Sequence, residues 1–448
     1  MQTGASCTGS GSAPAYRHST GDNFIFKGGV TWPAPCFTMA ISAGGTSSAQ
    51  DYYGVDKTWY SGGSWTRPLF DLNYAVVGMV IYAGVGFTGY TTFDNLEIYR
   101  QGIAANGSYA SQVAYQFGNG STGVIIQNNY IHDWATSNNV TVNTIEYSYG
   151  AIWAPAGSGV RLLNSTISDA NGYFYSGGVR KNGGFGGACE NCQEVSGSIF
   201  HDVMAACFSP GTCHDSEFYN VDAVNIGLYD SGIHSQVIED DGGGNSSVYN
   251  NYIHDNPAAV TVFVCPGSPI YNNVFYNNSN QAPIIVDTNF CFAQNPATAT
   301  QYIVNNTCDG TVNGSCVRLI RRGSTIGTVI MKNNIFINGN ISVEATVTNY
   351  INANNYSMGT AEANTYGFTS ARKYYPSSSD SHIVGQGANL TSSCSGNLTA
   401  LSLDTSGARW FGGSSVARLT KWDLGAYQSG TQSTSQPNAP NNLNAVVQ

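Results

Sequence analysis

The sequence predicts an all-β solenoid, in which short strands stack as successive coils of one elongated domain. The first observation is a short phrase that recurs ten times, in most copies as Asn-Asn followed by alternating apolar residues and a polar corner. Its copies begin at Asp94, Asn128, Asn164, Gly197, Asp215, Asn250, Asn272, Asn305, Asn333 and Asn354. This spacing fits a unit of roughly 20 residues that loops lengthen in several copies. The second observation is the composition, because only 10% of residues are charged while 53 are Gly and 28 are Tyr. These residues suit tight corners and stacked strands rather than helices.

Each phrase predicts a corner, a short strand and a second corner. In the copy at Asn128-Asn129, the strand contains Tyr130 and Ile131, and His132-Asp133 forms the next corner. If the units stack as parallel coils, equivalent Asn side chains lie above one another and can bond along the column, as in cross-β ladders. The inward Ile, Val, Phe and Tyr side chains then form a continuous core. Because the His-Asp pair recurs at one corner, we interpret it as a corner element rather than a catalytic one.

These repeats look like the coils of a right-handed parallel β-helix of about ten or more coils, and the chain resembles the secreted pectate-lyase-like superfamily. The repeats occupy residues 91–360, and residues 1–90 are expected to form an N-terminal cap with the first coil. Residues 361–428 end in Trp422-Asp423-Leu424-Gly425-Ala426-Tyr427, which resembles the closing coil of secreted bacterial β-helix proteins. Residues 429–448 read as a linker whose end resembles the first strand of a fibronectin type III module. The resemblance implies an extracellular, bacterial protein and specifies the fold far more strongly than the activity.

The charge of the chain excludes several partners. The formal net charge is −10 and no Lys/Arg run occurs, which argues against nucleic acid and anionic membranes as partners. No apolar stretch approaches the roughly 18 residues of a membrane span. No charged and apolar leader precedes Gln2, so we also expect no signal peptide.

The cysteines predict disulfides in an exported protein. The expected pairs are Cys7 with Cys36, Cys189 with Cys192, Cys207 with Cys213, Cys265 with Cys291, and Cys308 with Cys316. Cys394 is left over. A zinc site at Cys189-x-x-Cys192 stays open as an alternative, although no second close pair accompanies it.

Function on a solenoid is expected in the insertions that lengthen individual units. Three insertions, near 101–112, 136–148 and 170–184, follow the same corner and should lie beside one another, whereas a fourth, near 229–244, borders the adjoining face. They contain aromatic and charged side chains suited to sugar rings and their substituents. The substrate-binding candidates are Tyr147, Tyr149, Trp153, Tyr173, Tyr175, Glu146 and Asp230. For any single aromatic residue, packing of a loop onto the coils is the alternative.

The sharpest acidic cluster is Glu239-Asp240-Asp241. In an extended segment, Glu239 and Asp241 point the same way with Cα atoms roughly 7 Å apart, and Asp240 points the opposite way. Two carboxylates at this spacing could hold calcium, the one expected cofactor, or act as acid and base across a glycosidic bond, for which inverting enzymes use roughly 6.5–9.5 Å. A solvated turn is the third interpretation.

An elimination reaction requires other groups. A base must abstract the proton next to a uronate carboxylate, and a cation must stabilise the resulting charge. Lys181 could supply the base and Arg180 the charge, and His234 lies in the fourth insertion. The catalytic candidates are therefore Glu239, Asp241, Lys181, Arg180 and His234, with Glu239 and Asp241 as calcium ligands. The catalytic motifs of polygalacturonases and alginate epimerases are absent, so the resemblance carries no catalytic residue across.

Two functions remain open at this stage. The first is an exported protein that binds a polysaccharide and cleaves it as a lyase or glycoside hydrolase. The second is a non-catalytic surface or matrix protein that binds glycan or self-associates through its ends into fibres.

Overall fold

A computed structural model describes most of the β-rich part of the chain. The described residues are 17–84, 86–103, 112–136, 149–168, 189–203, 205–221, 236–240, 245–256, 260–278, 281–289, 291, 295–320, 324–377, 382–418 and 420–429. Internal contacts divide the chain into two compact units. The first unit is Met1–Pro210 with Val221–Ser235, and the second is Gly211–Asn220 with Gln236–Gln448.

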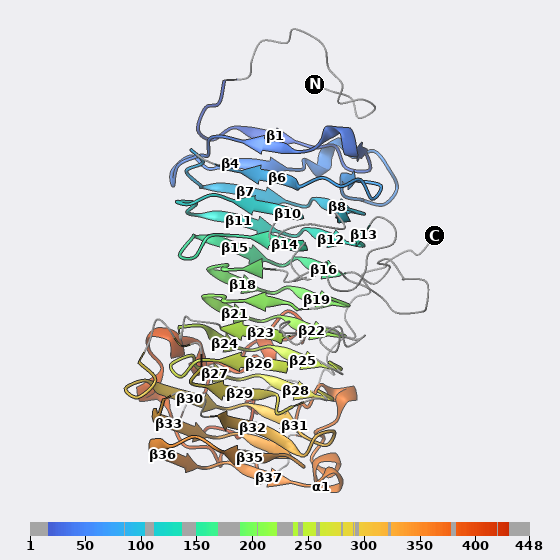
Figure 1. Cartoon of the computed structure of the whole chain (residues 1–448). Coiled ribbons are helices and arrows are strands. Elements are labelled where there is room, and N and C mark those ends of the chain that lie inside the picture. The colour runs from blue at the N-terminus through green and yellow to red at the C-terminus, as the bar shows by residue number, and fades with distance from the viewer. Residues whose placement is uncertain are drawn as a thin grey trace. The chain divides into compact units, whose positions relative to one another are not determined.

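The first unit contains three parallel sheets, and successive strands of the chain enter sheets A, B and C in turn (Figure 1). Sheet A contains β1 (Asn23–Ile25), β4 (Asp51–Gly54), β7 (Thr91–Asp94), β11 (Val124–Gln127), β15 (Val160–Leu163) and β18 (Glu194–Ser196). Sheet B contains β2 (Thr31–Pro33), β5 (Leu69–Asp71), β8 (Glu97–Tyr99), β12 (Tyr130–His132), β16 (Thr166–Ser168) and β19 (Ile199–His201). Sheet C contains β3 (Met39–Ile41), β6 (Met79–Ala83), β10 (Gln112–Phe117), β14 (Tyr149–Trp153), β17 (Cys189–Glu190) and β20 (Cys207–Phe208). The short strands β9 (Gly102–Ile103) and β13 (Ala135–Thr136) pair beside sheet B.

The second unit repeats this arrangement. Sheet A contains β21 (Thr212–His214), β24 (Ser247–Tyr249), β27 (Ile270–Tyr271), β30 (Thr300–Val304), β33 (Ile326–Lys332) and β36 (Val347–Ala353). Sheet B contains β22 (Glu217–Tyr219), β25 (Tyr252–His254), β28 (Val274–Tyr276), β31 (Thr307–Asp309), β34 (Ile335–Ile337) and β37 (Tyr356–Met358). Sheet C contains β23 (Gln236–Asp240), β26 (Val260–Val264), β29 (Ile284–Asp287), β32 (Ser315–Ile320) and β35 (Asn340–Val343).

Each strand pairs in parallel with the strand one coil later in the same sheet, as β11 does with β15 and β25 with β28. A chain that visits three sheets in turn and returns in parallel forms a right-handed parallel β-helix, which confirms the fold prediction. The segment expected to hold a cap and one coil, residues 1–90, contains two complete coils among its described residues, β1–β3 and β4–β6. The second of these coils was not predicted because its strands lack the Asn-Asn phrase.

The two residues of the Asn-Asn phrase have different roles. The first adopts a positive φ, as Asn128 (56°) and Asn305 (54°) do, and Asn tolerates this conformation at a corner better than other side chains with a Cβ. The second points inward and forms a ladder. In the second unit, the backbone amides of Asn251, Asn273 and Asn306 each donate to the side-chain oxygen of the ladder residue one coil later, at 3.0, 3.0 and 2.9 Å. The predicted stack of Asn side chains is therefore present.

The His-Asp pairs lie at the corners that follow sheet B or sheet A. Asp133, Asp202 and Asp255 have φ values of 56, 56 and 52°, and each accepts a hydrogen bond from the preceding histidine. His254 Nδ1 lies 2.8 Å from Asp255, and its Nε2 lies 3.2 Å from Glu217 on the neighbouring strand. Burial lowers the pKa of His254, but the bonds to Asp255 and Glu217 outweigh it, and the pKa is raised overall.

This shift predicts a pH dependence of stability. A raised folded pKa means that the contribution of His254 is fully present below its unfolded pKa of about 6.5 and is lost as pH rises through the folded value. We expect the free energy of unfolding in urea to fall over this window, and to fall less steeply in His254→Gln. An unchanged slope in the variant would assign the pH dependence to other groups.

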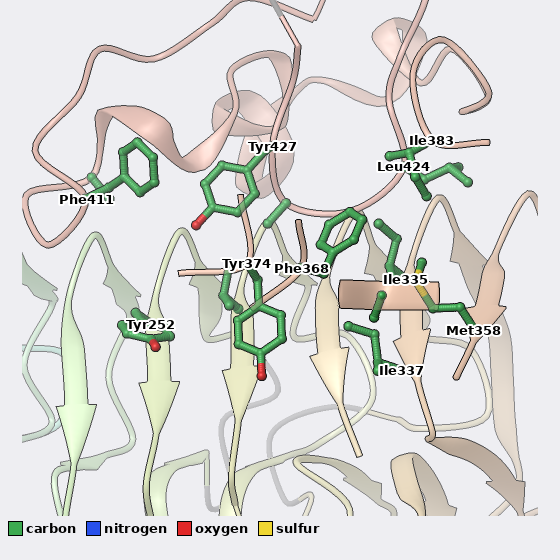
Figure 2. Packing of buried hydrophobic residues seen from close by; sticks show 14 of the residues in the cluster. Tyr252, Ile335, Ile337, Met358, Phe368, Tyr374, Ile383, Phe411, Leu424 and Tyr427 are labelled. Carbon is green, nitrogen blue, oxygen red and sulfur yellow. The ribbon is translucent and has the colours of Figure 1, made fainter. Parts of the chain in front are cut away.

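The C-terminal segment, residues 360–429, packs along the outward faces of the second unit. It contains α1 (Thr360–Thr365) and the short 3₁₀ helices Ser370–Arg372, Thr391–Ser393, Gly396–Ser402 and Thr405–Gly407. In Figure 2, Phe368 of this segment lies beside Ile335 of β34, and Tyr374 and Tyr427 lie toward the strand that carries Tyr252. Residues 361–428 were expected as closing coils, but their described part adds no strand to the three sheets. The difference arises because their apolar residues cover outward Tyr252, Val274, Ile335 and Ile337 rather than the end of the core.

Corner asparagines attach this segment to successive coils of the second unit. Trp410 Nε1 donates to the carbonyl of Asn250 at 2.7 Å, and Asn272 Nδ2 donates to the carbonyl of Leu403 at 2.8 Å. Asn305 and Asn333 bond to the segment in the same way, through Asp423 and Ala388. The first Asn of the phrase therefore serves both the corner and the docking of the segment.

Three disulfides link Cys189 with Cys192, Cys265 with Cys291, and Cys308 with Cys316, as predicted. Cys36 is also disulfide-bonded, and its predicted partner Cys7 lies outside the described residues. The predicted pair of Cys207 and Cys213 is not among the disulfides of the described residues. No helix in the described part of the chain is long and apolar enough to cross a membrane.

Candidate functional site

Four outward side chains form a row across sheet C of the first unit. Tyr82 of β6 pairs with Gln116 of β10, Gln116 with Trp153 of β14, and Trp153 with Glu190 of β17. Their inward neighbours in the strands, such as Tyr115, are fully buried in the core, so alternation places the row on the opposite face. Successive side chains of the row are about 4.8 Å apart along the sheet because that is the spacing of paired strands.

A surface hollow of about 380 Å³ opens beside this row. Tyr82, Gln116 and Trp153 line it, together with the turn that contains Gly118 and Asn119. A side chain at Gly84 would overlap the Tyr82 ring, and a Cβ at Gly118 would lie 2.9 Å from the carbonyl oxygen of Gly84. These two glycines therefore let the Tyr82 ring lie along the sheet and keep the hollow open.

Two polar atoms in this row have no hydrogen-bond partner among the residues that the structure describes. They are Gln116 Oε1 and Trp153 Nε1, and both are buried. A buried polar atom without a partner costs roughly 1–3 kcal/mol, so most such atoms in proteins are satisfied. One accepts and the other donates, which is the pair of functions that a sugar hydroxyl can satisfy.

Glu190 places a carboxylate next to Trp153. It lies within the Cys189–Cys192 disulfide loop, and Asn191 of the same loop donates from Nδ2 to the carbonyl of Ala154 at 3.1 Å. Asn191 has a φ of 55°, the left-handed conformation that Asn tolerates. The loop thus fixes the backbone of Glu190 against the strand that carries Trp153.

Among the predicted substrate-binding residues, Trp153 lies in this row. Tyr149 is the first residue of β14, four residues before Trp153, and only its backbone is described. The other candidates of the first unit lie outside the described residues: Glu146, Tyr147, Tyr173, Tyr175, Arg180, Lys181, Asp230 and His234. The segments that contain Glu146–Tyr147 and Tyr173–Lys181 re-enter sheet C at Tyr149 and Cys189, next to the row.

Glu239 and Asp240 lie in β23 of the second unit. Glu239 pairs with Phe263 in an outward column and is 2% exposed, whereas Asp240 pairs with Val264 in the core column and accepts a hydrogen bond from Ser268 Oγ at 2.5 Å. Asp241 lies outside the described residues, so the paired carboxylates remain a prediction. Among the described residues, no three His, Cys, Asp or Glu side chains are grouped so that they could hold a metal ion. Calcium binding likewise stays a prediction.

Sequence reasoning missed Tyr82, Gln116 and Glu190. Tyr82 and Gln116 lie in strands outside the insertions, and Glu190 lies beside the cysteine pair rather than in a charged cluster. The alternation of Met79-Val80-Ile81-Tyr82-Ala83 could have identified Tyr82 as an outward aromatic residue on a strand. Its alignment with Gln116 and Trp153 depends on the coil register across loops of unequal length.

Comparison with known proteins identifies distant structural likenesses. No family model matches the chain, and no curated protein matches it. The pectate lyase Pel9A is 14% identical with a TM-score of 0.44, over 92% of this chain and 89% of that one. The GH136 lacto-N-biosidase from Eubacterium ramulus is 12% identical with a TM-score of 0.40, over 76% of this chain and 62% of that one. The alginate lyase from Paenibacillus sp. str. FPU-7 is 14% identical with a TM-score of 0.29, over 75% and 93% of the two chains.

The chain is similar to these enzymes only distantly. Less than two thirds of the lacto-N-biosidase is matched. The β-helix is established by the parallel sheets of the chain itself, and the likenesses carry no argument about activity.

Proposed function

We propose that the protein binds a polysaccharide on the outward face of sheet C in the first unit and cleaves it. The observation that carries the proposal is the row of Tyr82, Gln116 and Trp153 beside a hollow, with two buried polar atoms for which the described part of the chain offers no partner. The two aromatic rings are separated by one strand, which leaves room for a sugar ring at each and for hydrogen bonds to Gln116 between them. Disulfides favour an oxidising, extracellular location.

The candidates for cleavage are the residues that the sequence predicts in the insertions and in the acidic cluster. In an elimination, the neutral amine of Lys181 would take the proton next to a uronate carboxylate, and Arg180 would stabilise the negative charge that develops. The electron pair would then form the C4–C5 double bond as the glycosidic C4–O bond breaks, and the leaving oxygen would take up a proton. In a hydrolysis, two carboxylates would act as acid and base, and Glu239 with Asp241 are the candidates, with His234 as a further proton carrier. Glu190 adds a carboxylate at the end of the row. Calcium at Glu239 and Asp241 would add positive charge, and neither the elimination nor the hydrolysis requires it.

The activity is tested by incubating the full chain with a panel of uronate and neutral polysaccharides, with and without calcium. Ultraviolet absorbance of an unsaturated uronate product and the appearance of reducing ends are followed together. Rising absorbance identifies a lyase, and reducing ends alone identify a hydrolase. If no polysaccharide of the panel yields a product, the catalytic part of the proposal is wrong.

Trp153→Ala should weaken binding of the responsive polysaccharide about tenfold, the equivalent of losing one stacked ring at about 1.4 kcal/mol. Affinity electrophoresis measures the change. Trp153→Phe keeps an aromatic face but loses the Nε1 donor, so it should retain only part of the affinity. Tyr302→Ala removes a tyrosine of the second unit that is remote in sequence from the row, and its affinity should equal that of the unsubstituted protein. Equal affinity of Trp153→Ala and the unsubstituted protein would place the polysaccharide elsewhere.

A second candidate function is self-assembly, and the last coil of the second unit favours it. Val343 of β35 and Tyr350 of β36 pair with the core residues Leu319 and Val329, yet are 44% and 38% exposed. No described strand pairs with the far edge of β36, and an uncovered strand edge can pair with another chain. Inactivity across the panel together with particles that lengthen with concentration under the electron microscope would favour this function.

A further inference from the structure

A second cluster of aromatic side chains projects from the first unit, on the loop that joins β4 of sheet A to β5 of sheet B. This loop contains the 3₁₀ helix Lys57–Trp59, followed by Tyr60 and Trp65. Trp59 is 46% exposed, the most exposed aromatic residue among the large apolar side chains of the described residues. Trp59 therefore presents an aromatic face to solvent on a loop whose other aromatic residues, Tyr60 and Trp65, are half-buried, and exposed apolar surface can mark a binding site.

The loop is built by specific contacts that fix its backbone. Asp56 caps the helix, because its Oδ1 accepts from the amide and the hydroxyl of Thr58 at 2.9 and 2.6 Å. Gly29 donates to the carbonyl of Thr66 at 3.1 Å. A Cβ on Gly29 would lie 2.8 Å from Tyr60 Cε2, so Tyr60 packs directly onto the glycine backbone of the preceding coil.

These contacts give the aromatic residues different roles. Tyr60 and Trp65 lie with ring centroids 5.9 Å apart, and Trp65 also contacts the Gly28 turn, where a Cβ would lie 3.2 Å from Cζ3. They cover the coil. Trp59 differs from them because 46% of its surface is exposed to solvent.

The charge near the rings indicates the chemistry of the ligand. Lys57 Nζ lies 5.3 Å from the centroid of the Trp65 ring, an arrangement that holds the ammonium close to the aromatic surface. Lys27, which precedes the Gly28 turn, is exposed. In a chain with a net charge of −10, the Lys57 ammonium beside the Trp65 ring complements a carboxylate.

We infer that Trp59, Trp65 and Lys57 form an ancillary binding site for an acidic glycan, with a sugar ring stacked on Trp59 and a uronate carboxylate near Lys57. This site does not depend on the proposed row of Tyr82, Gln116 and Trp153, which lies on sheet C. It would hold a long polysaccharide at a second point without taking part in its cleavage.

The inference is tested with oligogalacturonate and with neutral xylan oligosaccharides of similar length, followed by tryptophan fluorescence and affinity electrophoresis. We expect Trp59→Ala to weaken oligogalacturonate binding about tenfold in a protein that already carries Trp153→Ala, and Trp59→Phe to restore most of it. Lys57→Gln should weaken binding of the acidic glycan and leave xylan binding unchanged. Tyr74→Ala removes a similarly exposed aromatic residue elsewhere in the unit, 37% exposed, and should have no effect.

Each other outcome overturns a defined part of the inference. Equal binding of the acidic and neutral oligosaccharides would remove the role of Lys57. Unchanged binding in Trp59→Ala, with a folded protein by circular dichroism, would remove the site while leaving the row on sheet C untouched. Concentration-dependent dimers that disappear in Trp59→Ala would assign the patch to a second copy of the chain rather than to a glycan.

Discussion

Asn306→Ala should destabilise the second unit by roughly 3–5 kcal/mol, because the buried amide of Asn273 loses its acceptor at about 1–3 kcal/mol, and the bonds from Asn306 Nδ2 to Ile270, Val304 and Asn334 are lost from the same network. Asn306 Oδ1 accepts from the amide of Asn273 at 3.0 Å and from its Nδ2 at 3.1 Å. Asn306 Nδ2 donates in turn to Asn334 Oδ1 at 3.1 Å, and the residue is completely buried. Unfolding in urea, followed by circular dichroism, measures the change.

The matched control is Asn340→Ala, which makes the same chemical change at an exposed position of β35. Surface substitutions of this kind usually change the free energy of unfolding by less than about 0.5 kcal/mol. If Asn306→Ala and Asn340→Ala unfold at the same urea concentration, the ladder does not stabilise the coils.

Arg418→Met should cost about 3–5 kcal/mol and release the C-terminal segment, because the substitution removes a buried charge whose partners stay buried. Arg418 is 3% exposed and donates to Asn272 Oδ1 at 3.2 Å and to the carbonyls of Ala426 and Tyr427 at 2.8 and 3.2 Å. Burial lowers its pKa to about 10, which still leaves it protonated at neutral pH. Limited proteolysis should cut the variant after Met358 under conditions in which the unsubstituted protein is intact.

Arg372→Met is the corresponding control, since Arg372 lies in the same segment but is exposed. It should leave the proteolytic pattern unchanged. Equal resistance of the Arg418 and Arg372 variants would show that the segment is held by its apolar contacts alone.

The fold could be predicted because the corner and the ladder each require particular side chains. A corner with φ near 55° favours Asn or Asp, and an inward corner position next to backbone amides favours Asn, so the Asn-Asn pair recurs in six of the ten copies of the phrase. The early coils escaped detection because β4 and β5 are joined by the long loop that contains Trp59, without an Asn pair. The C-terminal segment was expected as closing coils because apolar residues such as Leu424 and Tyr427 suit a closing coil as well as a layer on the outward face.

Of the row on sheet C, the sequence singled out only Trp153 as a candidate. That residue follows an insertion, and insertions are recognisable in the sequence as departures from the period. Gln116 could not be identified, because its importance comes from its register between Tyr82 and Trp153 and from an unpartnered oxygen. Neither property follows from the residue type. The roles of Glu239, Lys181 and the other catalytic candidates stay predictions.

The docking of the C-terminal segment has a consequence for how the second unit opens. Coils that contact only their neighbours can separate one at a time from an exposed end. Here Asn250, Asn272, Asn305 and Asn333, from four successive coils, are all bonded to one segment. None of these coils can detach until the segment leaves, so their amides should exchange with solvent in a single concerted event rather than as a gradient from the end.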